Sequence, residues 1–146
     1  MRAVVTRVSR AVVKINGVQT GRIDNGLLIL LGISPDDIPQ TARRFANKIC
    51  NLRIFDDERG RMNLNLEQVG GSILVVSQFT LYADTSSNRP GFSGAAKSGI
   101  AQPLYELFID VCRERGFHTE HGLFGAEMQV ESVNEGPVTI FLDTQK

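Results

Sequence analysis

The residues that follow one strongly apolar run are the first candidates for chemistry. Residues 73–76 read ILVV, and Ser77, Gln78, Phe79 and Thr80 come directly after them. The end of a central strand is where α/β-type architectures often keep their sites. The pattern also fits polar groups of the core that find hydrogen-bond partners. The pattern therefore indicates a candidate site, but it does not indicate which reaction takes place there.

A second segment of interest is NEGPVT at residues 134–139, which contains Gly136-Pro137. Glycine followed by proline between two apolar runs ordinarily forms a turn and nothing more. By composition alone, this segment predicts a hairpin turn near the end of the chain.

Two histidines occur in the short sequence HTEH, where His118 and His121 stand on either side of Glu120. A zinc-protease helix needs HExxH, which places both imidazoles and a general base on one helical face. Here the glutamate is out of place, and the segment follows a helix stop at Gly116. We expect surface polar residues and no metal site.

The cysteines and the densest acidic segment give no catalytic pattern either. Cys50 and Cys112 lack CxxC spacing and fall in expected helices, so we interpret them as free, packed thiols of a reducing cytosol. The acidic residues 56–58 lie in an expected turn, where a solvated surface is the simpler interpretation.

Composition and charge limit the classes of function. The chain has 146 residues, 42% of them hydrophobic, with 16 basic and 16 acidic side chains and a formal net charge of zero. This excludes a disordered chain, and no apolar run is long enough for a membrane span. Arg2, Arg7 and Arg10 leave no apolar core of a signal peptide at the N-terminus. A protein that grips many phosphates usually has a basic excess, so any nucleic acid should be touched over a small part only. One expected helix face is basic, and it is either simply solvated or a modest phosphate-contact patch: Arg43, Arg44, Lys48 and Arg53.

The elements that must position these residues follow from the apolar pattern. β-branched runs in residues 2–15 predict a first strand, and hairpin signals at Asn16-Gly17 and at residues 24–26 bound a second one near 18–23. Residues 26–33 are apolar on both faces, which predicts a central strand that is covered on each side. A stripe at helical spacing predicts a helix over 36–52 that starts at a capping box of Ser34 and Asp37. The remaining segments predict a strand–turn–strand unit over 53–63, a long strand over 72–83, a loop over 84–95, a helix over 97–115 and two strands, 126–133 and 138–144.

This order of elements predicts the fold class. It is α/β in the α+β-like sense, with mixed, largely antiparallel sheets and two main helices in a single domain that covers residues 1–146. No glycine-rich nucleotide loop follows any strand, so we expect no nucleotide cofactor.

The two segments singled out above also carry a resemblance. SQFTL at 77–81 and NEGPVT at 134–139, in that order, resemble the two signature motifs of the D-aminoacyl-tRNA deacylases. The segments GLLILLGI, KICNLRIFDDERGRMN, NRPGF, PLYELF and GLFGAEMQV resemble the bacterial form of the family, so the resemblance covers nearly the whole chain. Glu135 stands where the family commonly has aspartate, at a variable position of the motif.

The resemblance implies an activity and a partner. The family hydrolyses the ester that joins a D-amino acid to the 3′-terminal adenosine of tRNA, and it also clears glycine mischarged on tRNA. It is a cytoplasmic homodimer without metal or cofactor. Gly136-Pro137 of one protomer would enter the pocket of the other through a cis peptide bond, and its backbone carbonyls would exclude an L side chain.

The resemblance also assigns roles along the first motif. Ser77 and Gln78 would belong to the pocket wall, with Gln78 anchoring the terminal ribose or adenine. Backbone N–H groups around Phe79 would hold the ester carbonyl and stabilise the developing oxyanion. Thr80 is the obvious side-chain nucleophile, but no residue is clearly placed to activate its hydroxyl, and the family is thought to use water assisted by the substrate's 2′-hydroxyl.

Three further residues are matched outside the first motif. Phe124 and Met128 correspond to positions that line the adenine pocket, and Arg7 to a residue that braces the Gly-Pro loop. Two other interpretations stay open. One is a related trans-editing deacylase with relaxed chirality, and the other is a non-enzymatic dimer that binds RNA 3′ ends.

Overall fold

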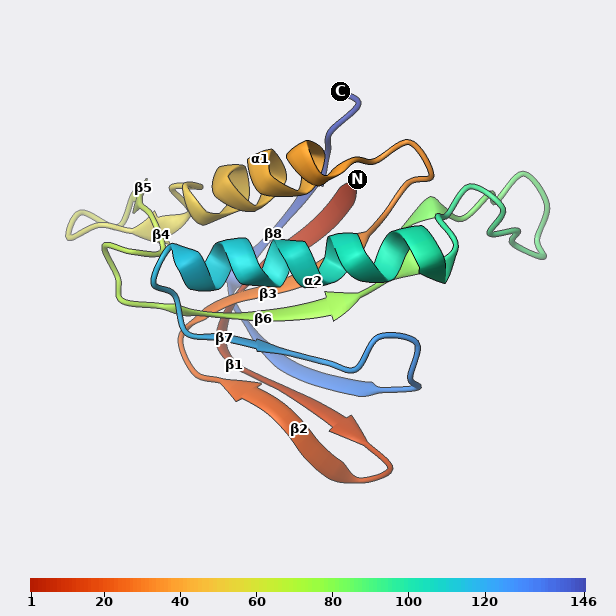
Figure 1. Cartoon of the computed structure of the whole chain (residues 1–146). Helices are drawn as coiled ribbons and strands as arrows, with labels where there is room; N and C mark the ends of the chain where they lie inside the picture. The colour runs from red at the N-terminus through yellow and green to blue at the C-terminus, as the bar shows by residue number, and fades with distance from the viewer.

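A six-stranded sheet forms the centre of the protein in the computed structural model, which describes Met1 to Lys146 (Figure 1). The strand order is β2-β1-β3-β6-β7, and β8 pairs with β1. Two helices complete the main architecture, and a small second sheet and a short 3-10 helix lie in the connections. The bounds are β1 Arg2–Ile15, β2 Val18–Ile23, β3 Gly26–Gly32, α1 Pro39–Cys50, β4 Phe55–Asp56, β5 Met62–Leu64, β6 Ser72–Ser77, η1 Phe79–Tyr82, α2 Ser98–Glu114, β7 Thr119–His121 and β8 Gln129–Asp143.

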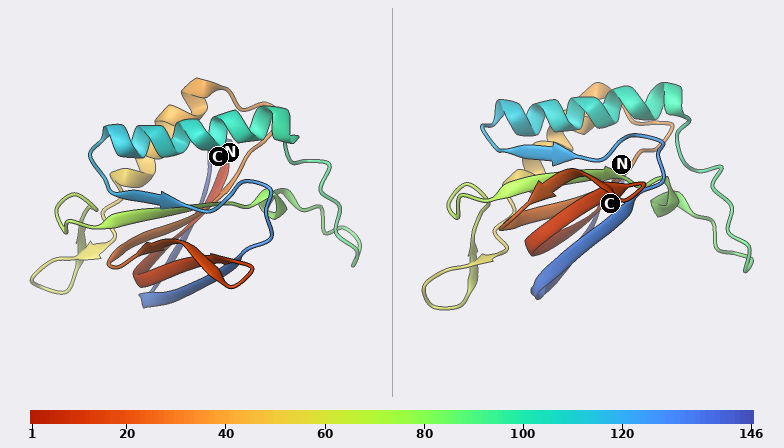
Figure 2. Two further views of the ribbon diagram at one scale, coloured as in Figure 1. Left: turned by 60° about the horizontal axis from the view of Figure 1, so that its bottom comes forward. Right: turned by 90° about the horizontal axis from the view of Figure 1, so that it is seen from below.

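The sheet is mixed, which confirms the predicted fold class. β1 is antiparallel to β2, β3 and β8, whereas β3–β6 and β6–β7 are parallel pairs. A parallel pair needs a crossover connection, and α1 and α2 lie within these two connections. Figures 1 and 2 show both helices on the same face of the sheet. Neither helix has the length and hydropathy required to cross a membrane.

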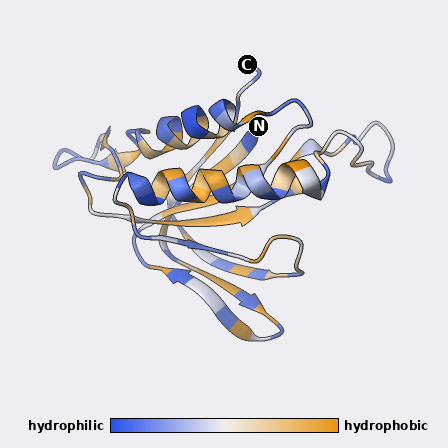
Figure 3. Cartoon of the chain, in the orientation of Figure 1, coloured by the Kyte–Doolittle hydropathy of each residue, from blue (hydrophilic) through white to orange (hydrophobic).

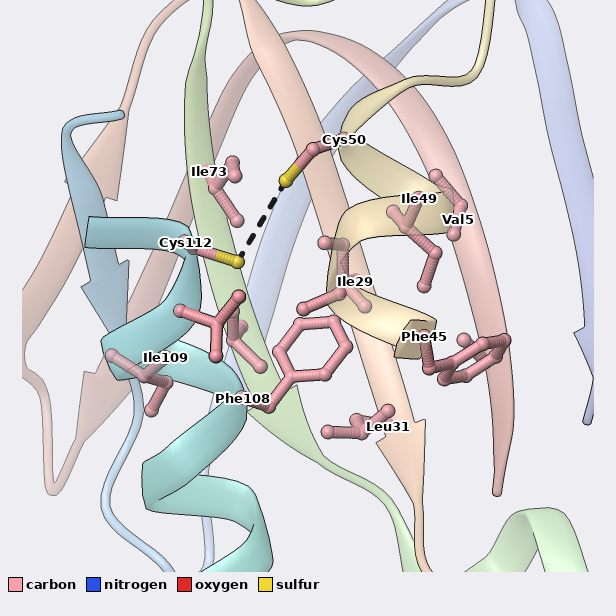
Figure 4. Close-up of a cluster of buried hydrophobic side chains, with 14 of the residues drawn as sticks. Val5, Ile29, Leu31, Phe45, Ile49, Cys50, Ile73, Phe108, Ile109 and Cys112 are labelled. Atoms are coloured by element: carbon pink, nitrogen blue, oxygen red, sulfur yellow. Dashed lines mark hydrogen bonds between the residues drawn. The ribbon is translucent and has the colours of Figure 1, made fainter. Parts of the chain in front are cut away.

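The main core lies between the helices and the sheet. It joins 25 buried residues, and its centre holds Phe108 of α2, Phe45 of α1 and Ile29 of β3 (Figure 4). The rings of Phe45 and Phe108 meet edge to face at 6.4 Å. Alternate residues of β3 and β6 belong to a second, smaller cluster, so both faces of these strands are covered, as their apolar sequences predict (Figure 3).

The predicted cysteine packing is confirmed in this core. Cys50 and Cys112 are free and buried, and their sulfur atoms lie 4.0 Å apart between the ends of the two helices (Figure 4). They contribute apolar volume to the contact between α1 and α2.

The first helix starts later than predicted. It begins at Pro39, because residues 34–37 form a separate turn in which Asp37 Oδ2 accepts the Ser34 N–H at 2.7 Å. The other oxygen of Asp37 accepts from the Met1 ammonium group at 2.9 Å. The capping pair therefore exists, but it closes a turn that anchors the N-terminus. The second helix is confirmed and continues through Pro103.

Three other predictions are corrected by strand pairing. The Asn16-Gly17 hairpin is confirmed, but β2 and β3 both pair with β1, so residues 24–26 do not close a hairpin between them. The long strand predicted over 72–83 ends at Ser77, where the 3-10 helix takes over. The two expected C-terminal strands are one strand, β8, because β1 is long enough to pair with both parts of it.

Candidate active site

A cavity of about 480 Å³ opens where β3 and β6 end. Its walls come from the ends of these strands, the start of α2 and the segment 124–130 that precedes and begins β8. Ten of its fifteen lining residues are hydrophobic, and Glu127 is the one charged side chain among them. A concave, mostly apolar site with few polar groups is typical of small-molecule and nucleoside pockets.

The first motif reaches this cavity with three of its residues. Ser77, Gln78 and Phe79 line its wall. Phe79 and Thr80 open the 3-10 helix, so their backbone N–H groups have no acceptor within that turn. Phe79 is 58% exposed, and its ring meets Phe92 edge to face at 5.2 Å. These N–H groups are therefore available to an oxygen atom of a ligand.

Thr80 is placed differently from its neighbours. It is exposed and does not belong to the lining residues of the cavity. The side-chain amide of Gln78 donates to its hydroxyl oxygen. An amide donor cannot remove the hydroxyl proton, and activation of a threonine needs a base that can. No base contacts the Thr80 hydroxyl in this structure.

The two residues matched to the adenine pocket both line the cavity. Phe124 packs edge to face on Tyr105 of α2 at 5.7 Å, and the Tyr105 hydroxyl donates to the Val75 carbonyl at 2.9 Å. Burial raises the pKa of Tyr105 well above its usual value, which keeps this donor protonated. The sulfur of Met128 lies against Gly122, where any added side chain would collide with it. An aromatic edge and a thioether thus form a fixed apolar wall.

The Gly136-Pro137 segment lies outside the cavity of its own chain. Both residues are exposed, and their peptide bond is cis, as predicted. In the pairing of β1 with β8, Thr6 matches Thr139 and Val8 matches Asn134. Only Arg7 lies between the two β1 residues, so residues 135–138 leave the ladder as a bulged loop, which we call the Gly-Pro loop.

Arg7 contacts this loop from β1, as the resemblance implies. Its Nε donates to the Glu135 carbonyl at 2.9 Å, and its Nη1 donates to the Ile54 carbonyl at 2.9 Å and to Asp56 at 3.2 Å. The residue is only 8% exposed. A buried guanidinium with three fixed acceptors holds the loop to the body of the protein.

Asn134 is a second support, which sequence reasoning missed. Its Oδ1 accepts the Val138 N–H at 2.9 Å, and its Nδ2 donates to the Thr139 hydroxyl at 2.8 Å. The side chain therefore joins the two ends of the Gly-Pro loop. The signal that could have found it was an asparagine at the start of a turn, where such side chains commonly bind backbone N–H groups.

The remaining candidates do not join the cavity. The His118 ring lies 3.5 Å from Glu120, and His121 contacts the Gly122 carbonyl. No group of three or more potential ligands gathers to hold a metal ion. The predicted acidic turn lies one residue later, because Asp56 is the last residue of β4 and the turn runs from Asp57 to Gly60. The Asp57 carboxylate accepts the N–H groups of Arg61 and Arg59, which holds its pKa below the usual range.

Two solved structures share the fold of this chain. The chain superimposes with a TM-score of 0.85 and 16% identity on a structure titled as a probable eukaryotic D-amino acid tRNA deacylase, covering 97% of each chain. At this identity the likeness shows the fold. It also matches, with a TM-score of 0.93 and 39% identity over 99% of each chain, a structure titled c-Myc DNA Unwinding Element Binding Protein.

Sequence comparison identifies the family. The family described as D-Tyr-tRNA(Tyr) deacylase matches residues 4–143. A D-aminoacyl-tRNA deacylase of Anaeromyxobacter dehalogenans is 54% identical over 147 residues, which covers 100% of this chain and 99% of the relative. One of Thermosipho africanus is 50% identical with the same coverage. The chain belongs to the D-Tyr-tRNA(Tyr) deacylase family.

Proposed function

We propose that this protein hydrolyses the ester of D-aminoacyl-tRNA as a cytoplasmic homodimer, in which each Gly-Pro loop completes the pocket of the other protomer. The deacylase activity follows from membership of the family and from the relatives of about half identity over the full length. The observation that supports the dimeric form is the separation of the two motifs. One lines a cavity, and the other stands exposed outside it.

The cavity takes the terminal adenosine of the substrate. Phe124 and Met128 offer an aromatic edge and a polarisable thioether, which suit a flat base. Gln78 anchors the ribose or the adenine, and Ser77 forms part of the wall. This leaves the ester near the start of the 3-10 helix.

The free N–H groups at Phe79 and Thr80 bind the ester carbonyl oxygen. They strengthen their hydrogen bonds as that oxygen becomes an oxyanion, which lowers the barrier to attack. Water is the nucleophile, assisted by the 2′-hydroxyl of the substrate, because no base contacts the Thr80 hydroxyl. The chain supplies position and a preorganised oxyanion site rather than a covalent nucleophile.

Chirality is selected by the Gly-Pro loop of the partner. Its backbone carbonyls accept hydrogen bonds from the α-ammonium group, which D-amino acids, L-amino acids and glycine share. An L side chain would point into this wall of backbone atoms, whereas a D side chain would point away from it. Glycine, without a side chain, passes the same filter.

β8 supports the proposed dimer. This 15-residue strand pairs only with β1, so its other edge is unpaired. Val133 and Phe141 on it are 43% and 54% exposed. A long, partly apolar open edge invites association, and a second copy of the chain would cover it. The Gly-Pro loop lies within the same strand, so it would meet the partner directly.

Ester release from D-Tyr-tRNA, L-Tyr-tRNA and Gly-tRNA tests the activity, and analytical ultracentrifugation tests the dimer. We expect cleavage of the D and glycyl esters only, and a mass about twice 16.1 kDa. Comparable cleavage of the L and D esters would instead identify a deacylase with relaxed chirality. Tight RNA binding without ester loss would identify a binding protein.

A further inference from the structure

A loop borders the mouth of the cavity and is not used by the chemistry described above. It comprises residues 84–97, which we call the 84–97 loop, and leads from the end of the 3-10 helix to the start of α2. Figure 1 shows it at the end of the molecule where β6 ends and α2 begins. Ala96 and Ser98 line the cavity on either side of Lys97. The loop therefore lies beside the cavity, where a nucleic-acid chain with its terminal nucleotide in the cavity would emerge.

Hydrogen bonds hold the loop in one shape. Asp84 and Gly91 exchange two backbone hydrogen bonds, at 2.8 and 3.0 Å, which close the segment between them. The Ala96 N–H donates to the Ile33 carbonyl at 2.8 Å, which ties the end of the loop to the end of β3. Phe92 packs on Phe79 at the cavity wall. The loop presents its side chains from a fixed backbone.

The loop carries two cations without acidic partners. Arg89 and Lys97 are exposed, and neither forms an ion pair; they share this with Arg44 and Lys48 of α1, but they lie on the loop that borders the cavity. The carboxylate of the loop itself, Asp84, accepts the Ser86 N–H, and this hydrogen bond lowers its pKa. Across the cavity stands one acidic side chain, Glu127. In a chain of zero net charge, an unpaired cation between two cavity-lining residues, with a second one on the same loop, favours the binding of anions beside the cavity.

We propose that Lys97 and Arg89 bind the phosphates of the nucleotides that precede the terminal adenosine of the tRNA. This inference rests on the proposed function, which puts that adenosine in the cavity. The 5′-phosphate of the adenosine must then leave through the mouth, next to Lys97. The ammonium group, on its flexible stem, meets this phosphate, and Arg89, farther along the same loop, meets a phosphate closer to the acceptor stem.

The basic face of α1 is the competing surface. There Arg43 lies 3.7 Å from Glu114. Arg53 lies beyond the end of α1, contrary to the prediction, and donates to the backbone carbonyl and the side chain of Asn63. Arg44 and Lys48 remain without ion pairs but lie on a helix that contributes no residue to the cavity. The 84–97 loop adjoins the cavity directly, which favours it for the single-stranded end.

Paired substrates test the proposal. One is D-Tyr-tRNA, and the other is D-tyrosyl adenosine ester, which has the adenosine but no phosphate. We expect Lys97→Gln to raise KM for the tRNA about three- to tenfold and to affect the adenosine ester several-fold less. The slope of log(kcat/KM) against log salt should fall by about 0.7 for each single-strand phosphate that the variant no longer neutralises. Arg89→Gln should act in the same way, and the double variant should combine both effects.

Two control variants separate the surfaces. Arg59→Gln removes an equally exposed arginine from the turn between β4 and β5, outside the cavity lining, and should change neither KM nor the salt slope. Lys48→Gln removes a cation of α1. The proposal is overturned if Lys48→Gln reproduces the effect and Lys97→Gln does not, or if Lys97→Gln impairs both substrates equally.

The failure of the inference can be told apart from the failure of the proposed function. If the wild type cleaves neither substrate, the proposed function is wrong. Binding of uncharged tRNA then tests the loop alone, through the salt dependence of its Kd in the wild type and in Lys97→Gln. An unchanged salt slope in that measurement contradicts the phosphate contact.

Discussion

The cavity and the Gly-Pro loop are built in opposite ways. The cavity adjoins the hydrophobic core. It begins where β3 and β6 end, and core residues of β3 and α2, such as Leu31 and Ala101, also line it. The Gly-Pro loop leaves an edge strand, lies in the open and contacts its own protomer mainly through Arg7 and Asn134. A pocket that must hold a base benefits from a packed surround. A loop that serves another copy, as we propose for this one, must lie on the surface, so polar contacts rather than burial must hold it in place.

From this comparison we expect substitutions in the Gly-Pro loop to lower activity more, and stability less, than substitutions in the wall of the cavity. We expect the largest effect from Gly136→Ala. Gly136 has φ +129°, and a Cβ there would lie 2.9 Å from Nη2 of Arg7 and from Cγ2 of Val138. The loop must shift, and kcat/KM for D-Tyr-tRNA should fall about 10²-fold in steady-state assays, as misplaced positioning groups do.

Gly60→Ala is the matched control for that variant. Gly60 also has a positive φ of 74°, but nothing lies within 4 Å of a Cβ built there. Both variants should lower the melting temperature, because both place alanine in an unfavourable backbone region, and Gly136→Ala should do so somewhat more because its Cβ also meets Arg7 and Val138. Only Gly136→Ala should lose activity beyond the loss of stability. Activity that tracks only the melting temperature in both would contradict the special role of the loop.

Arg7→Lys should come next in size. A lysine cannot reproduce the fork that bonds Glu135, Ile54 and Asp56 at once. We expect the ratio of kcat/KM for D-Tyr-tRNA over L-Tyr-tRNA to fall about twentyfold. Asp56→Asn keeps an oxygen acceptor at a half-exposed position and should change the ratio less than about twofold. A selectivity ratio that survives Arg7→Lys would show that Asn134 suffices to hold the loop.

Phe124→Ala tests the other side of the comparison. The loss of an aromatic wall should raise KM about tenfold, with a smaller change in kcat, because base–aromatic stacking is worth about 1–3 kcal/mol. Met128→Ala should act in the same direction and less strongly. Leu123→Ala, at an exposed neighbour outside this cavity, is the control. A defect in kcat alone would place Phe124 away from the base.

Thr80→Ala should have the smallest effect. Its hydroxyl has an amide donor and no base, and the residue does not line the cavity. We expect kcat to stay within about threefold of the wild type, whereas loss of a true nucleophile costs several orders of magnitude. A variant that still binds D-Tyr-tRNA but cleaves it only at the background rate would make Thr80 the attacking group.

Local sequence signals account for much of the fold. The β-branched runs of β1, the continuous apolar run of β3 and the apolar pattern of α2 predict elements that the structure confirms within a few residues. The predicted secondary structure is wrong where the pairing between strands, rather than the local sequence, determines which element forms. β7 has only three residues and no pattern of its own, and its pairing with β6 makes it a strand. The end of β6 at Ser77 was missed because apolar and polar residues alternate after it, as they do in a strand: Gln78, Phe79, Thr80 and Leu81.

The two motifs and the family were accessible from the sequence alone, because residue types and their order survive without coordinates. The sequence also determined the covered strands, the two helices and the absence of a basic excess. Only the tertiary structure decided that Ser77 and Met128 share a wall, that Thr80 lies off it and that Asn134 closes the Gly-Pro loop. It also decided that Lys97 stands free at the mouth. These facts depend on contacts between segments that are far apart in the chain. The pattern of apolar residues in a strand or helix shows which of its faces is buried, but it does not show which other segment packs against that face.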